Sequence, residues 1–186
     1  MSLDPKGQRY VSPAQRAGWT CQTSRGLKDR SKIHTEMPQS LSRVIAHGIF
    51  STKDRVPNLN PEIHPELFAY LAAILNGEGH EAIKVGGHVD HVHILYGLSR
   101  TTTIADTIQV VKTSTSKWIK TKGLEYQGFA WQSGYGIFGV SESNVDAAVR
   151  YIANQDIHHE KHSFQEEYRA LMRKHGIPID ERYVWD

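Results

Sequence analysis

Alternating and periodic apolar positions predict four elements between residues 42 and 96. Residues 42–52 are rich in apolar and β-branched side chains and predict a strand. Apolar residues then recur every three to four positions, which predicts an amphipathic helix over about 65–76, ended by the glycines that follow it. Residues 82–89 predict a second strand. Residues 88–96 alternate in polarity and predict a third strand, which would pair with the second as a hairpin.

The next segment predicts a helix, a strand and a helix. A second helix begins at Thr103, and a fourth strand with tight entry turns is expected within the glycine-containing stretch 129–141. Ser143 or Asn144 would then cap a third helix. The apolar stripes of these two helices are Ile104, Ile108, Val111 and Trp118, and Val145, Ala148, Val149 and Ile152.

A last helix and the order of the earlier elements complete the fold prediction. Ser163 and Glu166 have the spacing of a capping box, so a helix is expected to begin there and to end at Gly176. Up to the third helix the order is strand, helix, strand, strand, helix, strand, helix. This order predicts an α+β protein, a ferredoxin-like (RRM-like) sandwich whose antiparallel sheet is covered by helices on one face. The strand that contains His91 would be central, and its uncovered face would carry the chemistry.

Composition separates an N-terminal extension from this predicted domain. Residues 1–36 are polar, lack a persistent period and hold seven basic and three acidic residues, a net charge of +4. Either a basic arm or upstream sequence ahead of a natural start at Met37 would explain them, and the second interpretation is preferred. The domain would then span residues 37–176, with a short tail over 177–186.

The remaining composition narrows the class of protein. Outside the extension the chain has 15 basic and 17 acidic residues, so any contact with DNA must use local patches rather than overall positive charge. No apolar run approaches the roughly 18 residues of a membrane span, no signal region is present, and a cytoplasmic protein without a membrane partner is expected. The single cysteine, Cys21, forms no intrachain disulfide.

Two histidines stand one residue apart in the predicted third strand. Because side chains alternate along a strand, His91 and His93 would point to the same face, where they could share a metal ion or be ordinary polar positions. The neighbouring Asp90 could fix an imidazole tautomer. His88, His91 and His93 together could instead form a three-histidine zinc hydrolase site, although His88 would face away if the strand is continuous.

Two other groups of residues carry candidate chemistry. Tyr151 and Gln155 are four residues apart, so they would lie on one face of the third helix and present a phenol beside a neutral oxygen ligand. The polar face of the second helix carries lysines among hydroxyl groups, which is a candidate surface for phosphates. The residues expected to contact DNA are Lys112, Lys117 and Lys120, with Trp131 as a stacking surface for an unpaired base.

Three motifs in order resemble the single-tyrosine HUH transposases of small bacterial insertion sequences. They are His91-Val-His93, the stretch 131–138, and Tyr151-Ile-Ala-Asn-Gln155 followed by His158-His159 and Ser163-Phe164. The resemblance covers about residues 37–176. It implies a ferredoxin-like dimeric enzyme with a C-terminal catalytic helix that cuts and rejoins single-stranded DNA at hairpin-bearing element ends.

The resemblance also assigns roles. It implies Tyr151 as the nucleophile that forms a 5′-phosphotyrosine, with His91, His93 and Gln155 as ligands of Mg²⁺ or Mn²⁺. The tyrosine helix could act in its own chain or in the partner of a homodimer. His158, His159 and His162 could also bind metal at helical spacing, but they are interpreted as a polar helix end with one or two histidines near the nucleotide. A domesticated relative that binds hairpins without cleaving them is the non-enzymatic alternative.

Overall fold

The computed structural model describes residues 41–182, 184 and 185 of the chain of 186 residues. These residues belong to one compact unit, Ser40–Asp186. The predicted extension 1–36 and the predicted start at Met37 lie outside the described residues. Within the described ranges, no helix combines the length and the apolar character that crossing a membrane requires.

The described residues form four strands and five α-helices, joined by short 3₁₀ helices. The strands are β1 (Ile45–Ser51), β2 (Glu81–Gly87), β3 (His91–Gly97) and β4 (Gly136–Val140). The α-helices are α1 (His64–Gly77), α2 (Ile104–Ile119), α3 (Val145–Ala153), α4 (Gln155–His159) and α5 (Phe164–Lys174). The 3₁₀ helices are η2 (Lys53–Arg55), η3 (Pro61–Ile63), η4 (Leu124–Tyr126) and η5 (Glu142–Asn144).

The strands form one antiparallel sheet in the order β2-β3-β1-β4. The two central strands, β1 and β3, pair so that Ile49 lies opposite His93 and Ser51 lies opposite His91. This order, with a helix after β1 and another after β3, is the ferredoxin-like arrangement, and the prediction of the fold class is confirmed.

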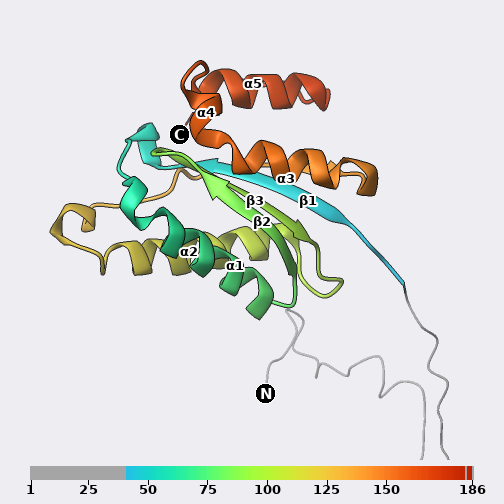
Figure 1. The fold of residues 1–186 in the computed structure, drawn as a ribbon, viewed down its shortest axis with the longest axis horizontal. Helices are drawn as coiled ribbons and strands as arrows, with labels where there is room; N and C mark the ends of the chain where they lie inside the picture. The colour runs from blue at the N-terminus through green and yellow to red at the C-terminus, as the bar shows by residue number, and fades with distance from the viewer. Residues whose placement is uncertain (1–40, 183, 186) are drawn as a thin grey trace, which may run out of the picture. The chain divides into compact units, whose positions relative to one another are not determined.

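Helices α1 and α2 cover one face of the sheet (Figure 1). The alternate residues Val92, Ile94 and Tyr96 of β3 point into this layer and are buried there. They pack against leucines of α1 and against Ile108 and Val111 of α2. The larger hydrophobic core therefore lies on the side of β3 that the sequence pattern predicts.

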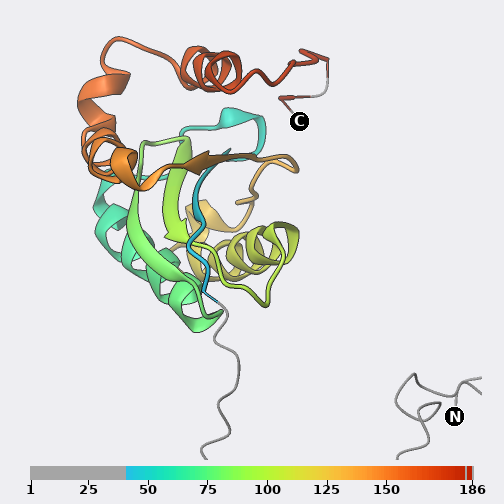
Figure 2. The same cartoon turned by 90° about the vertical axis from the view of Figure 1, so that its right-hand side faces the viewer.

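The opposite face is covered as well, by helices α3, α4 and α5 (Figures 1 and 2). Two smaller apolar clusters hold them in place: Ile49, Phe138, Phe164, Tyr168 and Met172, and Ile45, Leu95 and Ile152. The expectation that this face of the His91 strand is uncovered is therefore wrong. The amphipathic helices that follow β4 fold back over it, because their apolar stripes must be buried against another element.

The fourth strand is shorter than the predicted stretch 129–141. Regular pairing with β1 is confined to Gly136–Val140, and Trp131 makes one isolated bridge with Thr52. Residues 129–135 form a loop that returns to the core, where the rings of Phe129 and Trp131 meet edge to face, 4.9 Å apart. This aromatic run therefore fills the core next to the strand rather than extending it.

The helix ends differ from the prediction at one place that matters for the site. Asn144 precedes α3 but makes no side-chain cap, and α3 ends at Ala153. Asn154 leaves the helical conformation, so Gln155 opens the separate short helix α4. Ser163 caps α5 in a full capping box, as predicted.

The segment after α5 is packed onto the domain. Gly176 adopts the left-handed conformation (φ +66°) that ends the helix. Beyond it, Trp185 lies 5.8 Å from the ring of Tyr168, and its carbonyl accepts a hydrogen bond from the Arg55 guanidinium. The described part of the predicted tail 177–186 therefore contributes to the cover over α5.

Candidate active site

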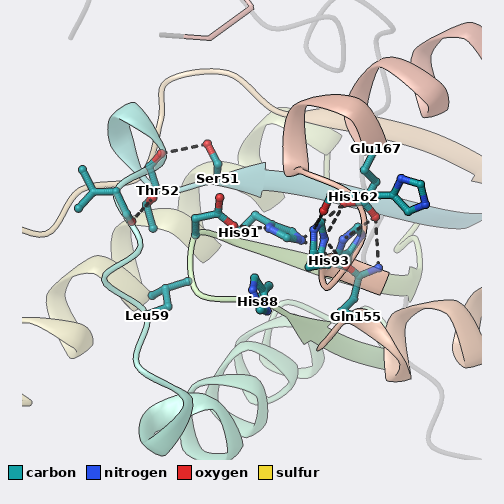
Figure 3. A network of polar contacts seen from close by, with 12 residues as sticks. Ser51, Thr52, Leu59, His88, His91, His93, Gln155, His162 and Glu167 are labelled. Carbon is teal, nitrogen blue, oxygen red and sulfur yellow. Dashed lines mark hydrogen bonds and ion pairs between the residues drawn. The ribbon is translucent and has the colours of Figure 1, made fainter. Parts of the chain in front are cut away.

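The predicted histidine pair lies side by side on β3, facing the layer of α3 to α5. His91 and His93 are fully buried, with their ring centroids 5.1 Å apart. Alternation along β3 places both rings on one face, opposite Val92 and Ile94. Figure 3 shows the two imidazoles between the sheet and α5.

An outer partner orients each imidazole. Nδ1 of His91 lies 2.7 Å from Oδ1 of Asp90, so this nitrogen donates to the carboxylate and Nε2 faces the site. Burial alone would raise the pKa of Asp90, but the hydrogen bond and charge of His91 lower it. Nδ1 of His93 lies 2.9 Å from Nε2 of His47, whose ring stacks on that of His93. Burial, reinforced by the charge of His93, lowers the pKa of His47 to about 3.

Gln155 reaches the same place from the start of α4. Its Oε1 lies 3.3 Å from Nε2 of His91, and its side chain is buried. The predicted proximity to His91 is therefore observed. Tyr151 and Gln155 do not share one helix, as was predicted, but both side chains donate to Oε1 of Glu167 and so still lie side by side. The break at Asn154 turns Gln155 out of the helix of Tyr151 and toward β3.

Glu167 of α5 is a member of the site that was not predicted. Its carboxylate lies 3.3 Å from Nε2 of His93 and 3.6 Å from Nε2 of His91, and it accepts a hydrogen bond from the Gln155 amide at 3.2 Å. Burial alone would raise the pKa of Glu167, but hydrogen bonds and charges from the surrounding histidines hold it well below the usual range. A sequence signal existed, because Glu167 lies on the apolar stripe of α5 beside Phe164 and Tyr168.

Tyr151 projects from α3 into this cluster. Its hydroxyl donates a hydrogen bond to Oε1 of Glu167, and its ring centroid lies 5.8 Å from that of His93 in the same chain. Burial raises the pKa of Tyr151 well above the ordinary value of 10.0, and the negative charge of Glu167 raises it further. The phenol is therefore held protonated beside the histidine pair.

The histidines of α4 form the edge of the cluster. Nε2 of His159 lies 2.9 Å from Oε1 of Gln155 and 3.2 Å from Oε2 of Glu167, and Nδ1 contacts the His162 carbonyl at 2.7 Å. His158 stacks edge-on against Tyr151. The prediction that histidines at this helix end lie near the site is consistent with this placement.

His88 does not join the pair, and the reason differs from the predicted one. The chain turns at 88–90, so β3 begins only at His91. His88 does not face away: its ring stacks on His159 at 5.1 Å, and its Nδ1 lies 3.2 Å from Oδ1 of Asp156. Among the described residues, the groups of ligand atoms that could hold a metal do not include His88, which disfavours the three-histidine hydrolase site.

The donor atoms fit a divalent cation. In the described part of the chain, two groups bring their ligand atoms within 4.8 Å of one another: His91, His93 and Glu167, and His158, His159 and Glu167. Nε2 of His93 and Oε2 of Glu167 are buried, and their contacts with Oε1 of Glu167 at 3.3 Å and with Nε2 of His159 at 3.2 Å do not have the geometry of a hydrogen bond among these residues. Buried polar atoms are rarely left unpaired, so their convergence indicates a place for a bound ion.

A cavity of about 470 Å³ reaches Tyr151 and Glu167 from the side of β4 and α5. Its lining combines polar groups, among them Ser141, Asn144 and Lys174, with apolar surface from Phe138 and α3. Tyr151 therefore faces a cavity that a ligand could enter from this side, whereas His91 and His93 are fully buried and do not line it.

The predicted DNA contacts lie on the other side of the sheet, along α2. Lys117 and Lys120 are exposed and line a cavity of about 580 Å³. Lys112 lines it too, but its amino group donates to the carbonyls of Gln132, Ser133 and Gly134. Burial lowers the pKa of Lys112 to about 8.

Trp131 is not presented as a stacking surface. The residue is 9% exposed; its ring lies edge to face with that of Phe50, and Nε1 donates to the Thr115 hydroxyl at 2.9 Å. Its placement gives no support to a role in DNA contact, because little of the ring surface is free. Lys112 is already occupied, so Lys117 and Lys120 are the better candidates.

Comparison with known proteins decides the family. The model of the IS200-like transposases matches residues 40–155, well over half of the chain. The chain belongs to this family. The match includes His91, His93 and Tyr151 and stops at Gln155, so α5 and Glu167 lie beyond it. A search of curated proteins finds no match.

Solved structures show the same fold. A Deinococcus radiodurans R1 protein assigned as a transposase is 25% identical, with a TM-score of 0.51 over 64% of this chain and 96% of that one. A REP-associated tyrosine transposase solved with a REP hairpin is 12% identical, with a TM-score of 0.50 over 67% of this chain and 74% of that one. The second likeness supports the fold alone.

Proposed function

We propose that this family member is a metal-dependent transposase that nicks and rejoins single-stranded DNA through Tyr151. The observation that carries the proposal is the position of the Tyr151 hydroxyl. It donates a hydrogen bond to Glu167, whose carboxylate lies beside the buried imidazoles of His91 and His93. A nucleophile and a set of converging metal-ligand atoms are the two parts that such a reaction requires. His91, His93 and Gln155 are the proposed ligands.

The residues divide the chemistry as follows. Attack of the Tyr151 oxygen on a phosphodiester would form a 5′-phosphotyrosine ester as the bond from phosphorus to the 3′ oxygen breaks. A 3′-hydroxyl is released, and the bond energy is conserved in the new ester for rejoining. The hydrogen bond to Glu167 would hold the phenol oxygen beside the imidazoles; the phenol proton is lost as the oxygen attacks and a proton is gained by the departing 3′ oxygen, so the step consumes no proton overall. A bound divalent cation, Mg²⁺ or Mn²⁺, would offset the negative charge of the phosphate and orient it. The histidines and Gln155 are oriented by Asp90, His47 and Glu167 to hold such an ion.

The DNA would approach Tyr151 through the cavity next to β4 and α5. Its Lys174 and hydroxyl or amide groups suit a phosphate backbone. A hairpin-bearing element end is the proposed substrate, and its duplex part would bind through Lys117 of α2 and Lys120, the residue that follows α2. A homodimer is also proposed, although Tyr151 lies beside the histidine pair of its own chain in this arrangement.

Cleavage of single-stranded oligonucleotides tests this function. The wild-type protein, with Mn²⁺ added, is expected to cut one strand of a hairpin-bearing element end, and His91→Ala is expected to abolish cutting because it removes a ligand atom. His162→Ala, an exposed histidine nearby, is the matched control and should cut normally. Binding of hairpins without cleavage at any metal concentration would favour the domesticated alternative, and normal cutting by His91→Ala would remove His91 from the mechanism.

A further inference from the structure

We propose that Glu167 is itself a ligand of the metal centre, a fourth donor beside His91, His93 and Gln155. The inference rests on the metal site of the proposed function, but concerns a residue that the family match does not reach. The proposal gives α5 a direct role, because Glu167 would add a negatively charged ligand to the neutral ligands of β3 and α4.

Distances support shared coordination. Oε1 of Glu167 lies 3.3 Å from Nε2 of His93, and Oε2 lies 3.6 Å from Nε2 of His91. With metal–ligand bonds of about 2.0–2.2 Å, neighbouring donors on one ion lie roughly 3–3.5 Å apart. Oε1 of Gln155, at 3.3 Å from Nε2 of His91, has the same kind of spacing. One ion between these atoms would therefore need only small shifts of the side chains.

The hydrogen bonds around the cluster direct the ligand atoms toward one common point. His91 commits Nδ1 to Asp90, so Nε2 is directed at two oxygen atoms, of Gln155 and Glu167. Neither oxygen is a donor in this contact. Three acceptor atoms that face one another repel. A cation bound between them would make the same arrangement attractive. Nε2 of His93 and Oε2 of Glu167, which make no hydrogen bond of good geometry among the described residues, belong to the same cluster.

Charge provides an independent argument. Imidazole nitrogens and an amide oxygen are neutral donors, and a dication held by them alone in a fully buried site would be uncompensated. Asp90 lies behind His91, on the Nδ1 side. Glu167, which is 4% exposed, is the carboxylate on the Nε2 side among the described residues and brings the compensating negative charge. A carboxylate among imidazoles makes Mn²⁺ a suitable probe ion.

A purely structural role is the competing explanation. Glu167 also lies 3.2 Å from Nε2 of His159, and a buried ion pair with that histidine could be its whole purpose. The two roles differ in one measurable respect. A structural carboxylate stabilises the fold without changing metal affinity in the folded protein, whereas a ligand changes the affinity itself.

Calorimetric titration of MnCl₂ into the full-length, DNA-free chain distinguishes the ligand role of Glu167 from the structural role. Glu167→Gln has nearly the same shape but no charge, and should weaken Mn²⁺ binding by more than the roughly 10- to 100-fold that is typical for loss of a partner that only orients a ligand, which is the loss expected for Asp90→Ala. Glu167→Asp should retain part of the affinity. Glu160→Gln removes an exposed charge close by and should bind as the wild type does.

Wild-type Mn²⁺ affinity in folded Glu167→Gln, checked by circular dichroism, would overturn the proposal. Should that variant fail to fold, Glu167→Asp takes its place: weakened binding supports ligation, and unchanged binding refutes it. Because no DNA is present, the result is separate from the cleavage function. A wild-type protein that binds Mn²⁺ through Glu167 but never cuts DNA would refute the proposed function alone.

Discussion

Nδ1 of His91 donates a hydrogen bond to Oδ1 of Asp90, its neighbour in sequence, over 2.7 Å. This contact leaves Nε2 as the nitrogen that faces Gln155 and Glu167. A carboxylate in this position fixes the tautomer and makes the opposite nitrogen a better metal ligand. The adjacency of the two residues in the sequence predicted this contact, which is observed.

Replacing Asp90 tests this orientation. Asp90→Ala is expected to lower Mn²⁺ affinity by about 10- to 100-fold, because His91 loses the partner that fixes its tautomer. Titration calorimetry on the purified chain measures the change. Asp156→Ala removes an exposed carboxylate that contacts His88 instead, and should leave affinity unchanged. Equal affinities in Asp90→Ala and the wild type would show that the contact is incidental.

Gly86 determines how closely the helix of Tyr151 approaches the sheet. A Cβ at Gly86, which pairs with His93, would lie 2.6 Å from the carbonyl oxygen of Ile152. Gly86→Ala is therefore expected to push α3 away, to reduce adduct formation at Tyr151, and to destabilise the fold by about 1–3 kcal/mol.

Chemical denaturation measures the free energy of unfolding of this variant. Gly77→Ala is the control, because nothing lies within 4 Å of its added Cβ and it belongs to α1. It should be neutral or more stable by up to about 1 kcal/mol. Unchanged stability and activity of Gly86→Ala would mean that α3 tolerates displacement.

The exposed lysines of α2 provide a test of the DNA surface. Lys117→Ala and Lys120→Ala should weaken binding of a hairpin oligonucleotide and reduce the salt dependence, by roughly 0.7–0.9 in the slope of log affinity against log salt for each lost phosphate contact. Fluorescence anisotropy at several salt concentrations gives both quantities. Lys122, which is paired with Glu66, serves as the control. Wild-type affinity and slope in both variants would place the DNA elsewhere.

His80 predicts a pH dependence of stability that is separate from the site. Its Nδ1 accepts from the Ser99 amide and its Nε2 contacts the Thr107 hydroxyl, each at 2.9 Å, so the buried ring is neutral. Burial lowers the pKa of His80 below 6.5 in the folded state. Between that lowered pKa and about 6.5 the unfolded chain binds more protons, so stability falls as the pH drops through this window.

Unfolding free energies between pH 7 and 5 check the sign. His80→Gln should have a shallower pH dependence than the wild type, by up to about 1.36 kcal/mol per pH unit. His162→Gln, at an exposed position, should keep the wild-type slope. A steeper slope in His80→Gln would contradict the account.

Local patterns predicted the sheet and its histidine pair well. Alternation along a strand is a property of neighbouring residues, so the opposite directions of His91 and Val92 followed directly. Gln155 was placed near His91 only through the family resemblance, and the helix break at Asn154 was not anticipated. No strong breaker residue marks that position in the sequence.

Long-range packing accounts for what was missed. Glu167 lies on an apolar stripe, but its partners are more than seventy residues earlier, and no local pattern connects them. Trp131 was expected to offer a stacking surface for an unpaired base. Its ring packs instead in the hydrophobic core, edge to face with Phe50 and beside buried residues of α2.

Mapping a covalent DNA adduct tests the central claim most directly. The wild-type protein, incubated with Mn²⁺ and a labelled single-stranded element end, should form a denaturation-resistant adduct whose 5′-phosphate is found on Tyr151 by mass spectrometry. Tyr151→Phe should bind the same DNA without forming it, and Tyr70→Phe, a tyrosine of α1 stacked on Trp118, should form it normally. An adduct that persists in Tyr151→Phe, or that maps to another residue, would contradict the assignment of Tyr151 as the nucleophile.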